Sequence, residues 1–252
     1  QSSRTLLNQI PLAQRVYERL KHDQRQAGDP PELGLTAAAG PDTPRVFDRK
    51  SGQPLNGGIP GLYTYNGYYH FFLTESPKLV DRLADESWIL GATAQVSTNP
   101  AERQQIADNL CRLYLSDYLR LWQELLNDIK IKEFDNPGAA LDILQVLSGP
   151  ASPLRALFQT IARETALDRP PAPSPADKTP PADRSLTEKI AGIINKADAP
   201  TAAKALSCGV DPRLLGLNGQ YGRETGGPEG GIPPLDKTLS ALNDLYSHMN
   251  AI

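Results

Sequence analysis

The clearest pattern in the chain is a run of apolar positions spaced three and four residues apart, between residues 100 and 129. The run contains Ile106, Leu110, Leu113, Tyr114, Tyr118, Leu121, Trp122, Leu125 and Ile129. This spacing places the apolar side chains on one face of an α-helix. Thr98-Asn99-Pro100 precedes the run and is typical of a helix start, with a polar cap and proline at the first helical position. The pattern predicts a spine helix of about 30 residues, about 45 Å long.

Shorter segments with the same spacing occur on both sides of the spine. They predict helices over 5–27 with a break at Pro11, over 65–87 with a restart at Pro77, over 137–147, from 153 to 161, over 185–197 and over 235–252. Segments 28–58 and 216–234 are rich in Gly and Pro, which predicts loops, with one short strand at Arg45-Val46-Phe47. The predicted fold class is therefore mainly α: a multi-helix bundle with one long spine helix, an irregular aromatic elbow and little or no β-structure.

A proline-rich segment divides this helical pattern. Residues 168–183 read DRPPAPSPADKTPPAD, with six prolines and almost nothing apolar. Such a composition does not bury a core and is typical of an extended linker. We therefore predict a helical domain at 1–167, a linker at 168–183, and a C-terminal helical segment at 184–252 that packs on the first domain or follows it.

The segment GGIPGLYTYNGYYHFF, residues 57–72, forms the aromatic elbow. It holds six of the sixteen aromatic residues of the chain. After Thr64, a predicted N-cap, the side chains of Tyr65, Tyr68, Tyr69 and Phe72 are expected on one helical face. Packing against the spine is the favoured interpretation, and a protein interface or a small-ligand or glycan site are the alternatives. The candidate structural or interface residues are Tyr63, Tyr65, Tyr68, Tyr69, Trp88 and Trp122.

A search for catalytic patterns yields no candidate catalytic, cofactor-binding or metal-binding residue. The carboxylate pairs Asp81/Asp85 and Glu124/Asp128 have helical spacing but are expected on solvated faces, whereas acid–base work needs a desolvated carboxylate with a raised pKa. Ser76 and Ser152 precede prolines and are expected to cap helices. Glu86 is the acid whose neighbour, Trp88, would desolvate it. The glycine-rich segment 226–231 contains Glu229 and no Lys, unlike a phosphate-binding loop. We therefore predict that the chain is not an enzyme.

Charge, hydropathy and cysteine content exclude several kinds of partner and site. The formal net charge is −3, the pI is about 5.7, and basic residues are scattered, so nucleic acid is not an expected partner. No apolar run reaches the roughly 18 residues of a membrane span. Cys111 and Cys208 are interpreted as free, partly buried thiols, with a disulfide in an oxidising compartment as the alternative. Two Cys and three dispersed His do not form a metal site.

Several segments, in this order and spacing, resemble the IcmF/TssM family of type VI secretion systems. They are Pro11-Leu12-Ala13-Gln14-Arg15-Val16-Tyr17, Ile59-Pro60-Gly61-Leu62-Tyr63-Thr64, Gly67-Tyr68, Trp88-Ile89-Leu90-Gly91, Tyr114-Leu115-Ser116-Asp117-Tyr118, Trp122, Leu125, Asp128-Ile129, Leu147-Ser148, Ser152-Pro153-Leu154 and Glu164-Thr165. The resemblance runs from about Leu6 to Thr165.

The resemblance implies a structural role in a trans-envelope complex. It places the chain in the periplasmic part of a bacterial inner-membrane protein that is anchored in the membrane only through segments outside this sequence. The implied partners are other copies of itself, a TssL-type inner-membrane protein and a TssJ-type outer-membrane lipoprotein, whose contact is expected outside this chain. The family's nucleotide-binding motif is not found in this sequence, so no nucleotide is expected. The alternative function is a helical periplasmic protein that binds or cleaves peptidoglycan, with Glu86 as its acid.

Overall fold

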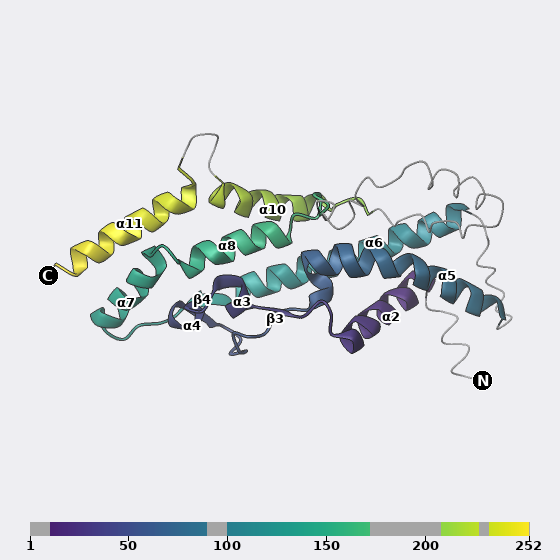
Figure 1. The fold of residues 1–252 in the computed structure, drawn as a ribbon, viewed down its shortest axis with the longest axis horizontal. Helices are drawn as coiled ribbons and strands as arrows, with labels where there is room; N and C mark the ends of the chain where they lie inside the picture. Colours follow the sequence, from purple (N-terminus) through teal and green to yellow (C-terminus); the bar gives the residue numbers. More distant parts are fainter. Residues whose placement is uncertain (1–10, 90–99, 172–207, 227–231, 252) are drawn as a thin grey trace, which may run out of the picture.

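A computed structural model describes residues 11–89, 100–171, 208–226 and 232–251, with the side chains of 83–89 left out of the description. The fold class is the predicted one, mainly α, with two small two-stranded sheets. Figure 1 shows an elongated body, with the long helix α6 in one half and α7 and α11 extending beyond its end in the other. The helices are α2 (Leu12–Ala27), α3 (Leu35–Ala39), α4 (Thr43–Val46), α5 (Leu73–Ile89), α6 (Pro100–Asp128), α7 (Pro137–Ser148), α8 (Pro153–Glu164), α10 (Pro212–Thr225) and α11 (Pro234–Met249).

The long helix α6 is the predicted spine and has 29 residues. Most of the apolar positions that predicted it are indeed buried, among them Leu110, Tyr114, Tyr118, Trp122 and Leu125. The helix ends at Asp128, one residue earlier than the apolar pattern suggested. Ile129 instead begins strand β4 (Ile129–Ile131).

The two sheets fix the chain at the carboxyl end of the spine. β4 pairs antiparallel with β2 (Phe47–Arg49), and β1 (Leu33–Gly34) pairs antiparallel with β3 (Gly58–Ile59). Asp128 lies at the junction, where its carboxylate accepts hydrogen bonds from Arg49 Nε at 2.6 Å and from the Ser51 amide at 2.7 Å. The strand predicted at residues 45–47 is wrong in part. Arg45 and Val46 belong to α4, and only Phe47 lies in β2.

The helices after the spine pack in two pairs. α10 lies along α8, and α11 lies along α7 (Figure 1). The predicted loop at 216–234 is wrong over its first part, since α10 extends to Thr225. Asp211 caps this helix through the Arg213 amide, and Leu214 is fully buried. Glycine lowers helix propensity, but the cap and the packing of the apolar face outweigh that loss here.

The region around Pro77 also differs from the prediction. α5 runs without interruption from Leu73 to Ile89, so Pro77 lies inside the helix rather than at a new start. Ser76 is not an N-cap, because its hydroxyl donates a hydrogen bond to the Phe72 carbonyl one turn earlier. Pro77 has no amide hydrogen to donate to the Leu73 carbonyl one turn earlier, so α5 lacks one backbone hydrogen bond at this point.

Some predictions fall outside the described residues. These are the first part of the helix at 5–27, the helix start at Thr98-Asn99, the linker from residue 172 on, the helix at 185–197 and the glycines after 226. The side chains of Glu86 and Trp88 are likewise outside the description. The division into two domains and a linker stays a prediction.

Candidate functional site

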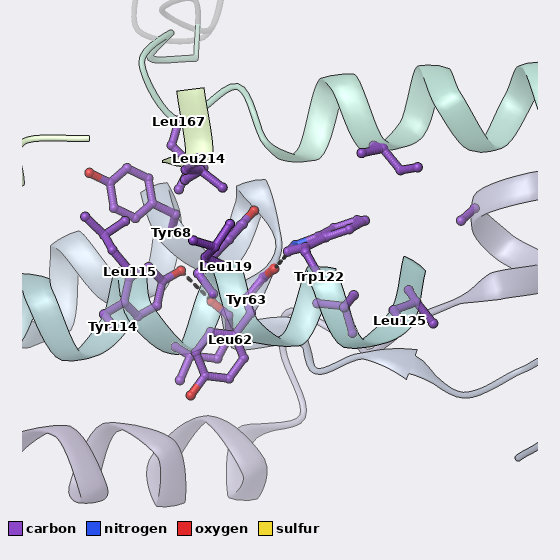
Figure 2. Packing of buried hydrophobic residues seen from close by; sticks show 14 of the residues in the cluster. Leu62, Tyr63, Tyr68, Tyr114, Leu115, Leu119, Trp122, Leu125, Leu167 and Leu214 are labelled. Atoms are coloured by element: carbon purple, nitrogen blue, oxygen red, sulfur yellow. Dashed lines mark hydrogen bonds between the residues drawn. The ribbon is translucent and has the colours of Figure 1, made fainter. Parts of the chain in front are cut away.

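The elbow and the spine meet in a cluster of stacked rings, which we call the aromatic joint. It consists of Tyr63, Tyr68 and Phe72 from the elbow and Tyr114, Tyr118 and Trp122 from α6. The Phe72 and Tyr114 rings stack with centroids 3.8 Å apart, and the rings of Tyr63 and Tyr68 lie 5.6 and 5.7 Å from that of Tyr114. All six side chains are at most 5 % exposed. Packing of the elbow against the spine, the favoured interpretation, is what the structure shows (Figure 2).

The polar atoms of the joint are bonded to backbone carbonyls. Tyr114 Oη donates to Leu62 O at 2.7 Å, Trp122 Nε1 donates to Tyr63 O at 3.1 Å, and Tyr118 Oη donates to Glu164 O at 2.6 Å. Buried Tyr and Trp side chains are stabilised when their polar ends find such partners. The rings of the joint pack on one another, and their polar ends bond to backbone carbonyls of the same chain. These contacts connect the elbow, the spine and the end of α8.

The backbone of the elbow is tight at two glycines. A Cβ on Gly61 would lie 1.8 Å from Pro30 O, and a Cβ on Gly67 would lie 2.1 Å from Gly61 O. These contacts are far shorter than van der Waals distance, so a larger residue would displace the backbone. Thr64 Oγ1 donates to Gly61 O and accepts from the Gly67 amide at 3.0 Å, which confirms the predicted cap.

The four elbow residues expected on one helical face form a series of ring contacts: the centroids of Tyr65 and Tyr69 and those of Tyr68 and Tyr69 are 4.8 Å apart, and those of Tyr68 and Phe72 are 6.1 Å apart. Residues Gly67–Phe72 form a π-helix, in which each turn contains an extra residue. Tyr68 and Phe72 stack on Tyr114 of the spine and are buried, whereas Tyr65 and Tyr69 are half-buried. Tyr65 Oη donates to Arg169 O at 2.6 Å, and Tyr69 Oη donates to Leu167 O at 2.7 Å. Single π-turns often occur at functional sites, and sequence periodicity at 3.6 residues does not reveal them.

A second set of polar residues joins α2 to the joint. Tyr17 Oη lies 2.7 Å from Tyr63 Oη and donates to Asp117 Oδ2 at 2.7 Å, while Arg120 lies 3.1 Å from Asp117 Oδ1. Burial raises the pKa of Tyr17 and raises the pKa of Tyr63 to about 12. Burial also acts to raise the pKa of Asp117, but hydrogen bonds from Tyr17 and Arg120 outweigh it and lower that pKa. Sequence reasoning missed this network, because Tyr17 is 100 residues from Asp117.

We expect Asp117→Asn to lower the free energy of unfolding by about 1 kcal/mol at neutral pH, since it weakens a charge-assisted hydrogen bond. The folded-state pKa of Asp117 lies below its usual 3.8. The carboxylate therefore stabilises the fold above that pH, and the stabilisation is lost as the pH falls through the folded-state pKa. Urea unfolding of both proteins between pH 7 and 3 tests this. The control Asp81→Asn removes an exposed ion pair with Arg103 and should change little. A difference that grows toward acid pH would contradict the expectation.

The cysteines are paired, so the favoured interpretation of free thiols is wrong. Cys111 of the spine forms a disulfide with Cys208, 97 residues later in the sequence. Cys208 precedes α10, and the packing of α10 on α8 brings it to the spine. No local pattern signals this contact, because it depends on that packing.

The acidic residues considered for catalysis have structural partners where the structure describes them. Glu124 is exposed, as expected, and pairs with Arg120 at 3.0 Å. The expectation of a solvated face is wrong for Asp128, whose side chain is only 15 % exposed because it is bound by Arg49 and Ser51. Within the described ranges, no group of three or more His, Cys, Asp or Glu side chains could hold a metal ion. Over the same ranges, none of the helices combines the length and the apolar character that crossing a membrane requires.

The fold and the joint define a mainly α-helical protein, built on one spine helix with an aromatic elbow packed against it. Residues 1–166 match the model of the family described as "IcmF-related: Intracellular multiplication and human macrophage-killing". The chain belongs to this family.

A relative from Pseudomonas aeruginosa, described as "Type VI secretion system component TssM1", is 35 % identical to the chain over 255 residues. The match covers 99 % of this chain and 23 % of the relative, so the chain spans about a quarter of the relative's length. The search of solved structures gave no match.

Proposed function

We propose that this chain is a non-catalytic scaffold segment of the trans-envelope membrane complex of a type VI secretion system. Family membership and the similarity to a TssM1 component support the assignment to this system. The aromatic joint is the observation that carries the structural role. Its rings and polar ends are occupied by contacts within the chain, which favours a stiff connection between elements over an open reaction site.

The periplasm is the proposed location. Disulfides persist in oxidising compartments such as the bacterial periplasm and are rare in the cytosol, and the Cys111–Cys208 bond fits that setting. The proposed contacts are with other copies of this protein and with a TssL-type inner-membrane protein. The contact with a TssJ-type outer-membrane lipoprotein is proposed to lie outside these residues.

Deletion of residues 57–91 in the complete polypeptide tests the scaffold role. This deletion removes the elbow and α5, so we expect both assembly of the membrane complex and secretion to be lost while the protein remains in the inner membrane. Immunoblotting of membranes, purification of the complex and a secretion assay report the three quantities. As a control, Glu75→Ala with Lys78→Ala removes an exposed ion pair from the same segment, and it should leave all three unchanged.

Normal assembly and secretion after the deletion would contradict the proposal. The peptidoglycan alternative predicts a different result with the purified chain. It requires that the chain release soluble muropeptides from isolated sacculi and that Glu86→Gln abolish the release. We expect no release from either protein.

A further inference from the structure

A cleft of about 510 Å³ opens beside the outer side of the elbow, where α8, α10 and the segment after α8 meet. Tyr65, Arg163, Arg169, Pro170, Pro171 and Thr225 are prominent on its walls. Between them lie residues with small side chains or none: Ala162, Ala166, Gly222 and Gly226. The lining of the cleft thus combines one aromatic ring, two prolines and two cationic side chains with several small residues.

The charged side chains that line the cleft are both arginines, in a protein whose net charge is −3. The side chains of Arg163 and Arg169 are 66 % and 78 % exposed. Arg163 Nη2 lies 3.1 Å from Glu164 Oε1, whereas Arg169 Nε lies 4.0 Å from Asp168 Oδ2, at the outer limit of an ion pair. Much of the hydrogen-bonding capacity of both guanidinium groups faces solvent, and the local charge favours an anionic ligand.

Tyr65 makes two hydrogen bonds that position the arginines, one to the carboxylate of Glu164 and one to the backbone of Arg169. Its amide donates to Glu164 Oε2 at 2.8 Å, and the other oxygen of this carboxylate binds Arg163. The Tyr65 hydroxyl donates to the carbonyl oxygen of Arg169 at 2.6 Å. Glu164 is 8 % exposed, so this support is largely shielded from water. Tyr65 is thereby tied both to the acid that pairs with Arg163 and to the backbone of Arg169.

We propose that this cleft binds an extended acidic peptide segment of a partner protein, with a carboxylate held by Arg163 and Arg169. A guanidinium group can bind a carboxylate with two parallel hydrogen bonds. The Tyr65 ring and the two prolines offer apolar contact to the flanking peptide, and the small residues of the lining leave room for its backbone. Ala162 and Gly222 lie within helices, where backbone amides are already bonded, so they do not form an amide cradle of the kind that binds phosphate. The inference rests on the proposed function, because the peptide would come from another protein of the complex.

The test uses the purified chain and two fluorescein-labelled peptides, Gly-Ala-Glu-Pro-Glu-Ala-Gly and the same peptide with both Glu replaced by Gln. Fluorescence anisotropy should show at least tenfold weaker binding of the Gln peptide. Arg163→Gln with Arg169→Gln should weaken binding of the Glu peptide at least tenfold, and Arg169→Gln alone should weaken it in part without touching Glu164. Affinity should also fall with added salt. Arg223→Gln changes an exposed arginine of α10 outside the cleft and serves as the control.

Three results would overturn the inference: no binding of the Glu peptide, equal binding of both peptides, or an unchanged affinity in the double variant. Arginine-dependent binding to isolated sacculi or to anionic lipid vesicles in place of the peptide would also overturn it. Thermal unfolding of each variant shows whether it is folded. The peptide assay involves no secretion machinery, so its failure would leave the scaffold proposal standing, and the deletion experiment would decide that proposal separately.

Discussion

Replacing Trp122 with alanine is expected to lower the free energy of unfolding by about 3–5 kcal/mol, the usual range for a large buried aromatic residue. Trp122 is 1 % exposed, and its ring stacks on Tyr118 with centroids 6.5 Å apart. Its removal would leave a cavity in the spine face and an unpaired carbonyl on Tyr63, which accepts the indole N–H. Because domains are stable by only about 5–15 kcal/mol, this loss would leave the fold marginal.

Urea unfolding followed by circular dichroism measures this change, and two further variants identify its origin. Trp122→Phe keeps much of the ring but not the hydrogen bond, so it should cost clearly less than alanine. Glu124→Ala changes an exposed residue on the same helix and should stay within about 0.5 kcal/mol of the native protein. If Trp122→Ala were no more destabilising than Glu124→Ala, the aromatic joint would not hold the elbow to the spine.

The helices could be predicted from the sequence where an apolar stripe within the helix itself marks them. The spine and α2 have an apolar stripe at three-four spacing that packing then buries, so periodicity and structure agree. The errors occur where local preference and tertiary contacts conflict. Gly216 and its neighbouring glycines favour a loop by propensity, yet the buried face around Leu214 holds α10 in helical form. Proline likewise favours a helix start, yet Pro77 lies inside α5, where it removes one backbone hydrogen bond.

The sequence predicts which aromatic residues of the elbow and the spine form the joint, but not which residues from other segments bond to them. Tyr63, Tyr68 and Trp122 are identified by aromatic density and by the apolar stripe, and all three are buried in the joint. The residues that complete it come from distant segments: Tyr17 lies 46 positions before Tyr63, and the Glu164 carbonyl lies 46 positions after Tyr118. The cleft beside Tyr65 was not predicted either, because its other walls come from α8, α10 and the segment after α8, about 100 residues or more beyond the elbow in the sequence.

The disulfide should stabilise the protein mainly by lowering the conformational entropy of the unfolded chain. The bond joins cysteines 97 residues apart, and cross-links that close long loops reduce the entropy of the unfolded state, typically by the equivalent of about 2–4 kcal/mol. In the folded protein, α10 has its own attachments to α8: Asn218 donates to Ala162 O, and the Tyr221 ring packs edge-on against Phe158. We therefore expect Cys111→Ser with Cys208→Ser to retain the native fold and to lower the melting temperature by on the order of 10 °C.

Reductant provides the matched control for this prediction. Adding it to the native protein should lower the melting temperature to that of the double variant, whereas the double variant itself should not respond, because it has no bond to lose. Circular dichroism before heating would show that helix content is unchanged in both. A native protein that melts at the same temperature with and without reductant would mean that the bond is not formed in solution. A double variant that has lost helix content at ambient temperature would mean that α10 depends on the bond for its docking, and not on Asn218 and Tyr221.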